Sequence, residues 1–242
     1  MKMVFKDLLK KIVKSKRFYM LLIIYVFIGI NSFYTYKNNI EPNINYNIYS
    51  NITNIAISTY LIIPLYLFLN EITTTKFNTY KVLLKYNNIN MWWIHKTIGT
   101  FIISIVWVII MNCTTFIVLF LTKHTLDNEF IKYMLLENLF QIVGLMILGN
   151  MYNLINVLSN KKYIGFLVTY GFILFSKGLN SGFKLKINTL DEYMFLLQKC
   201  NNYSSYILIN DYIKLIWFIL LFIVIYSYTL TLIEKKDIYW SE

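Results

Sequence analysis

The sequence predicts an all-α, polytopic membrane protein, and its composition and apolar runs are the observations that predict it. Of its 242 residues, 57% are apolar and only 14% are charged, whereas a soluble domain averages about 45–50% apolar and about 25% charged residues. The mean hydropathy is +0.53. A body of this size folded in water could not enclose so much apolar surface. The composition therefore argues against a soluble enzyme, a nucleic-acid-binding domain and a secreted disulfide scaffold.

Six apolar runs approach the roughly 20 residues that a helix needs to cross the hydrocarbon layer. They cover residues 17–36, 52–69, 97–121, 137–158, 163–176 and 212–233, within a single transmembrane domain over 1–242. The fifth run is short and contains Gly165 and Gly171. We expect it to be extended, tilted or broken.

The first 16 residues combine a basic pattern with an apolar one. Lysines recur every four residues, at Lys2, Lys6, Lys10 and Lys14. Apolar side chains recur at helical spacing, and they are Val4, Phe5, Leu8, Leu9, Ile12 and Val13. A helix of this kind lies along the anionic inner leaflet of a membrane. A signal peptide would begin in the same way, but no small-x-small cleavage site follows the next apolar run. The pattern therefore predicts an interfacial amphipathic helix over 1–16.

The distribution of charge predicts the orientation. With a cytoplasmic amino terminus, most of the 23 lysines and arginines lie on inner segments, and most of the 12 acids lie outside or at the outer interface. Cytoplasmic loops carry this excess of basic residues in membrane proteins. Both termini are then cytoplasmic.

Three connections follow from this topology. Residues 37–51 are expected to form a polar outer loop, and residues 70–96 a cytoplasmic loop whose 80–86 stretch looks helical. Residues 177–211 form a second outer segment with short apolar runs that are too short to cross a bilayer. Such runs are typical of re-entrant or interfacial helices.

The sequence contains few groups that could carry chemistry inside the membrane. Glu137 is the best candidate, because an ionisable residue within a span is a functional hypothesis by default. Its closeness to Lys132 at the start of the fourth run makes contact with the outer headgroups an alternative explanation. His95 and His124 are expected at opposite membrane faces, so they cannot share a metal. Enzymatic motifs are absent, and we expect no catalytic residue, metal or cofactor on this chain.

Polar residues line one stripe of the fourth run. Asn150, Asn153 and Asn156 recur every three residues, and such side chains seek partners on other helices. They either pack the bundle together or face a subunit interface or translocation path.

Tryptophan and tyrosine pairs flank the third and sixth runs. We expect Trp92 with Trp93, and Tyr239 with Trp240, to anchor these helices at headgroup depth. Cys113 and Cys200 are expected to be free thiols.

The outline resembles the membrane subunit of type-2 ABC exporters, and more narrowly the permeases of bacteriocin (lantibiotic) immunity and peptide export in Gram-positive bacteria. A local motif at the exit of the second run supports the resemblance. In the family, a glutamate is followed by a Gly/Asn-Thr element, a Leu-Leu pair and a lysine that opens the third span. The corresponding residues here are Glu71, Asn78, Thr79, Tyr80, Lys81, Leu83, Leu84 and Lys96.

The resemblance implies a division of labour between chains. The 70–96 loop would supply a coupling helix for a separate ABC ATPase subunit, which binds ATP and Mg. A second permease copy or a paralogue would complete the path for an amphipathic peptide across the bacterial plasma membrane, with 177–211 as an outer gate. A stand-alone immunity or sensor protein that binds a peptide without moving it is the alternative. A secondary carrier is disfavoured because intramembrane charges are few.

Overall fold

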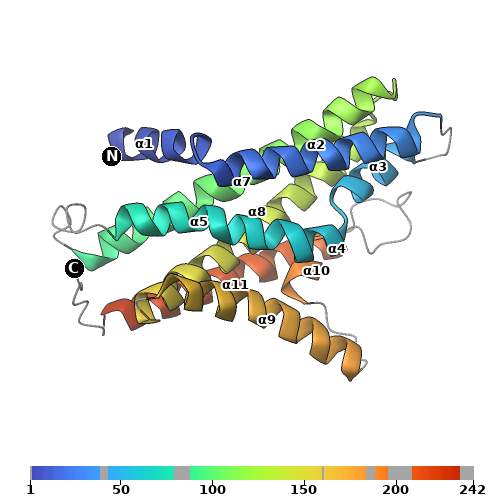
Figure 1. The fold of residues 1–242 in the computed structure, drawn as a ribbon. Helices are drawn as coiled ribbons and strands as arrows, with labels where there is room; N and C mark the ends of the chain where they lie inside the picture. The colour runs from blue at the N-terminus through green and yellow to red at the C-terminus, as the bar shows by residue number, and fades with distance from the viewer. Residues whose placement is uncertain are drawn as a thin grey trace.

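The computed structural model describes residues 2–38, 43–78, 88–159, 161–183, 189–195 and 209–234. Throughout these ranges the regular structure is helical (Figure 1). The main helices are α1 (Lys2–Val13), α2 (Lys16–Tyr36), α3 (Ile44–Ile52), α5 (Ile63–Phe77), α7 (Ile89–Leu121), α8 (Asn128–Ser159), α9 (Lys162–Gly182) and α11 (Ile209–Glu234). Shorter elements are α4 (Ile55–Ile57), the π-helical turn η1 (Ser58–Ile62) and α10 (Leu190–Met194).

Five helical segments are long and apolar enough to cross a membrane. They are Lys16–Tyr36, Ile44–Ile72, Ile89–Leu121, Asn128–Ser159 and Tyr212–Glu234. The predicted all-helical class is therefore confirmed over the described residues, and the five segments agree with a multi-pass membrane protein. Six spans and an interfacial helix over 1–16 stay predictions. The fifth predicted run belongs to α9, an unbroken helix of 21 residues that extends beyond the run at its carboxyl end.

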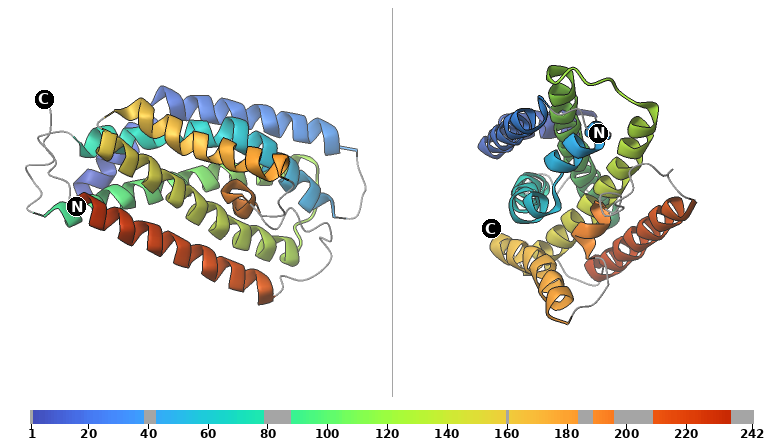
Figure 2. Two further views of the ribbon diagram at one scale, coloured as in Figure 1. Left: turned by 90° about the horizontal axis from the view of Figure 1, so that it is seen from below. Right: turned by 90° about the vertical axis from the view of Figure 1, so that its right-hand side faces the viewer.

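The long helices lie side by side and alternate in direction along the chain (Figures 1 and 2). One end of the bundle, called here the terminal end, holds the start of α1 and the finish of α11. The opposite end, called the α10 end, holds α3 and α10. Helix α8 lies at the centre and packs against α5, α7, α9, α10 and α11.

Local signals in the sequence set several helix boundaries. The Ser15 hydroxyl accepts a hydrogen bond from the Phe18 amide and separates α1 from α2. Asn54 and Asn88 begin α4 and α7 in the same way, through side-chain oxygens that accept backbone amide hydrogens. These caps satisfy amides that the first helical turn leaves unpaired.

The predicted polar loop over 37–51 is wrong for residues 44–51, which belong to α3. Ile44, Ile48 and Ile52 recur every four residues and are buried, as is Tyr49. The asparagines between them made this apolar helix face hard to recognise as part of the bundle.

The predicted loop over 70–96 is also too long. Helix α5 continues to Phe77 and α7 begins at Ile89, so the connection between them is much shorter. The stretch 80–86, expected to be helical, lies outside the described residues.

The expectation that Trp92 and Trp93 anchor α7 at headgroup depth is wrong. Both side chains are buried in a cluster with Phe77, Val157 and Ile233, and the Trp92 indole donates a hydrogen bond to the Phe77 carbonyl at 2.9 Å. They pack four helix ends together instead of facing lipid. Tyr239 and Trp240 lie outside the described residues.

Candidate functional site

Two ionic or polar contacts organise the terminal end of the bundle. The first joins α2 to α5, because Arg17 Nη1 lies 2.8 Å from Glu71 Oε2. The same guanidinium donates to the Phe68 carbonyl at 2.6 Å. Glu71, a residue of the family-like motif, therefore fixes the start of the first apolar helix to the exit of α5.

The second contact joins the exit of α5 to the start of α7. Lys96 is fully buried, and its Nζ donates to Asn78 Oδ1 at 3.2 Å. The ammonium also lies 4.9 Å from the Trp92 ring centre and 5.5 Å from that of Trp93. Aromatic faces attract a cation, and a buried charge needs such compensation.

Asn78 and Lys96 thus connect the two sides of the 79–87 stretch. The other residues of the predicted coupling element lie outside the described residues: Thr79, Tyr80, Lys81, Leu83 and Leu84. Their role stays a prediction.

A polar cluster inside the bundle joins α5, α7 and α8. The Thr97 hydroxyl donates to Asn150 Oδ1 at 3.2 Å, and Asn153 Nδ2 donates to Thr100 Oγ1 at 2.9 Å. The Thr100 hydroxyl in turn lies 3.1 Å from Asn70 Oδ1. Asn150 and Asn153 are fully buried, and these hydrogen bonds join helices of one chain. A role of the stripe at a subunit interface or translocation path stays a prediction.

Sequence reasoning found the asparagines of α8 but missed their partners. Thr97, Thr100 and Asn70 are ordinary polar residues in apolar runs, and only their shared position along neighbouring helices shows that they meet. Asn156, the third residue of the stripe, packs against α9 at Gly165, where any side chain would overlap it.

Glu137 is fully buried in α8. Its side chain is enclosed by protein instead of being extended toward a headgroup. One turn further along α8, the Gln141 amide donates to the Tyr49 hydroxyl at 3.2 Å. A functional role for Glu137 stays a hypothesis from the sequence.

A buried ion pair holds the α10 end together. Lys177 Nζ of α9 lies 2.6 Å from Asp191 Oδ2 of α10, and it also donates to the Thr59 hydroxyl at 2.7 Å. Thr59 donates to the same Asp191 oxygen at 2.7 Å, and Thr189 donates to the other at 2.6 Å. Because Thr59 lies in the π-helical turn η1, these bonds connect three separate segments of the chain.

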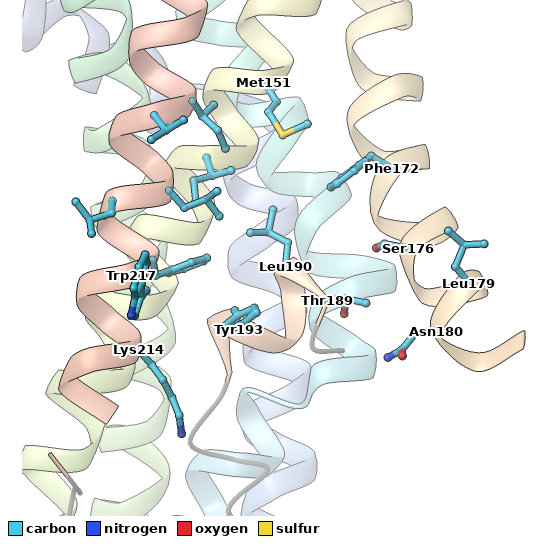
Figure 3. A pocket seen from close by; sticks show the side chains of 16 residues that line it. Met151, Phe172, Ser176, Leu179, Asn180, Thr189, Leu190, Tyr193, Lys214 and Trp217 are labelled. Atoms are coloured by element: carbon cyan, nitrogen blue, oxygen red, sulfur yellow. The ribbon is translucent and has the colours of Figure 1, made fainter. Parts of the chain in front are cut away.

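An apolar groove of about 860 Å³ runs between α9 and α11 (Figure 3). Helix α8 contributes Ile147 and Met151 to it, and α10 contributes Leu190 and Tyr193. The Lys177–Asp191 pair fixes α10 in its place beside the groove. No residue of this groove was singled out in the sequence as a binding candidate, because its walls are formed by apolar helix faces that look like ordinary lipid contacts.

The remaining candidates from the sequence lie apart. His95 is near the start of α7 and His124 lies just beyond its end, at opposite ends of the bundle as predicted. Cys113 is a free, exposed thiol, and Cys200 lies outside the described residues. Among the residues that the structure describes, no three His, Cys, Asp or Glu side chains gather as metal ligands would.

The fold and these contacts define the class of the protein as helical and multi-pass, with helices suited to a membrane. Neither the models of known protein families nor the sequences of curated proteins match this chain.

Proposed function

We propose that this chain is the membrane-spanning permease subunit of an ATP-driven exporter that moves an amphipathic antimicrobial peptide. In this proposal a separate ABC ATPase binds ATP and Mg, and a second permease copy or a paralogue completes the translocation path. Changes in helix packing, driven by the ATPase, would open and close that path in the bacterial plasma membrane.

The direction of the helices supports six crossings. Helices α8 and α11 run from the α10 end to the terminal end, so the chain must return between them, and α9 is the segment that does so (Figure 1). Its 21 residues extend about 32 Å at about 1.5 Å per residue, close to the roughly 30 Å of a hydrocarbon core. The ion pair with Asp191 offsets the charge of Lys177 near its end.

Helix α1 supports a cytoplasmic terminal end. It buries Leu8 and Ile12 in the bundle core and exposes its lysines at positions 6, 10 and 11. Exposed lysines next to a first span favour the cytoplasmic side and bind the anionic lipids of the inner leaflet.

The observation that carries the proposal is the pair of contacts on either side of the 79–87 stretch. Glu71 is bonded to Arg17 of α2, and Asn78 to Lys96 of α7. Through these two contacts, a movement of the 79–87 connection caused by an ATPase would be transmitted to α2, α5 and α7 together. Its residues Val82, Leu83 and Leu84 are apolar, and apolar side chains on a cytoplasmic loop would need a partner surface or the membrane to cover them.

Binding to an ATPase tests the proposal. The first step is to ask whether the neighbouring reading frame encodes an ATPase with a phosphate loop, and to purify it together with this chain. Replacing Leu83 and Leu84 with Asp should abolish co-purification, because charged side chains would be buried unpaired in the contact. The control is Leu126→Asp, an exposed leucine beyond α7 at the α10 end.

Unchanged binding by the double variant would refute the assignment of the coupling element. Equal loss with Leu126→Asp would indicate a general defect in folding instead. If the chain protects cells from a peptide with no ATPase present, the stand-alone immunity or sensor function replaces the exporter.

A further inference from the structure

The groove between α9 and α11 has the dimensions of a ligand site. Its volume is about 860 Å³, and small-molecule sites usually enclose about 300–1,000 Å³. Two long helices form its sides, α8 contributes to it between them, and α10 lies at one end (Figure 3). Trp217 and Leu221 line it from α11 and are 69% and 45% exposed, so the groove is open sideways to the hydrocarbon of a membrane.

The polar residues that line the groove lie near the α10 end, and the lining further along the bundle axis is apolar. Lys214, Asn180 and Thr189 lie toward the α10 end, whereas Met151 and Phe172 lie deeper along the helices (Figure 3). Among the described lining residues, Lys214 alone carries a charge. A cation near the start of a membrane helix lies at the depth of the headgroups, with apolar side chains below it.

The Asn180 side chain adds a hydrogen-bonding group on the wall opposite Lys214. Its Oδ1 is buried, and within the described part of the chain it has no hydrogen-bond partner. A buried polar atom without a partner costs free energy, and a hydroxyl donor on a ligand would satisfy it.

We propose that this groove binds one anionic phospholipid with a hydroxylated headgroup, such as phosphatidylglycerol. The phosphate lies beside Lys214, a headgroup hydroxyl donates to Asn180, and an acyl chain follows the apolar lining toward Met151. A lipid fits better than an amphipathic peptide, because the described lining combines one cation at headgroup depth with a long apolar wall. This inference requires only that the bundle spans a membrane, and it does not depend on the exporter function.

Native mass spectrometry of the purified, delipidated full chain tests the proposal. The probes are phosphatidylglycerol and phosphatidylcholine with identical acyl chains. The wild-type protein should retain phosphatidylglycerol roughly tenfold more tightly, which is the effect of one charge-assisted contact.

Two variants separate the headgroup contact from the acyl-chain contact. Lys214→Gln should abolish the preference for phosphatidylglycerol, whereas Lys132→Gln, an exposed cation at the same end of the bundle, should keep it. Leu221→Trp should fill the groove and weaken both lipids. Ile223→Trp is the matched control, because Ile223 is similarly exposed at 49% on the same helix and does not line the groove.

The proposal is overturned if Lys214→Gln keeps the preference, or if the two tryptophan variants retain equal amounts of lipid. A thermal unfolding curve for each variant confirms that the compared proteins are folded. Retention of an amphipathic peptide that Leu221→Trp blocks, with no lipid retained by the wild type, would assign the groove to peptide instead.

Discussion

Asp191 is a fully buried carboxylate whose two oxygens both have partners. Lys177 and Thr59 contact one oxygen and Thr189 the other, at 2.6–2.7 Å. Removing one member of a buried ion pair lowers the free energy of unfolding, because the other charge is then buried without a compensating partner. The position of α10 against the bundle therefore depends on this side chain together with the burial of Met194, which packs against Gly144 of α8.

We predict that Asp191→Asn destabilises the protein strongly. The free energy of unfolding should fall by about 3–5 kcal/mol, as for other broken buried pairs. Equilibrium unfolding in detergent micelles, followed by circular dichroism, measures it. The control is Lys132→Gln, whose pair with Glu129 is exposed, with side chains 63% and 51% accessible. This control should change the free energy by less than about 1 kcal/mol, and equal effects of the two variants would contradict the account.

The predicted topology puts Lys177 and Asp191 on the outer side of the membrane, but it does not predict that they form an ion pair. Lys177 follows an apolar run and Asp191 lies in a polar segment, and each alone looks like a charge at a span end. Their contact depends on α10 folding back against η1, which no periodic pattern encodes. The capping box that starts α10, Thr189 with Glu192, was the local signal available.

Helix α8 is the element around which the others pack, and its glycines set how closely they approach. A methyl group at Gly149 would overlap the Thr100 side chain and lie 2.7 Å from the Tyr66 hydroxyl. Gly171 of α9 has no atom within 4 Å of the same position. Small residues allow membrane helices to approach closely where they face a neighbour.

Gly149→Ala should therefore destabilise the bundle while Gly171→Ala does not. We expect Gly149→Ala to lower the free energy of unfolding by about 1–3 kcal/mol through overpacking. Gly171→Ala should leave it unchanged or raise it by about 0.5–1 kcal/mol, because alanine favours a helix. The same unfolding assay measures both, and a larger loss at Gly171 would show that the packing of α8 is misassigned.

At the scale of elements, the apolar runs predicted where helices occur better than where they end. The expected spans 97–121 and 137–158 became the longer helices Ile89–Leu121 and Asn128–Ser159. Their added turns contain Trp93, Lys96 and Phe130, which are buried by neighbouring helices. Hydropathy cannot separate a headgroup tryptophan from one that is buried by tertiary packing, and this difference accounts for the error at Trp92 and Trp93.

The whole molecule has two unlike ends, and the proposed function depends on which end faces the cytoplasm. The Arg17–Glu71 and Asn78–Lys96 contacts lie at the terminal end, while the Lys177–Asp191 pair lies at the α10 end. Composition alone predicted the membrane class, and lysine distribution predicted the orientation. The short fifth run, 163–176, predicted a further span, and α9 runs back through the bundle there although it is not among the five segments long and apolar enough to cross a membrane.

Labelling of single cysteines with a membrane-impermeant maleimide in intact cells tests the central claim most directly. In a cysteine-free background, Lys123→Cys and Ser181→Cys at the α10 end should react at once. Asn88→Cys and Lys161→Cys at the terminal end should react only after the membrane is permeabilised. The opposite pattern would put the predicted coupling element outside the cell, and labelling of positions 161 and 181 from the same side would show that α9 does not cross.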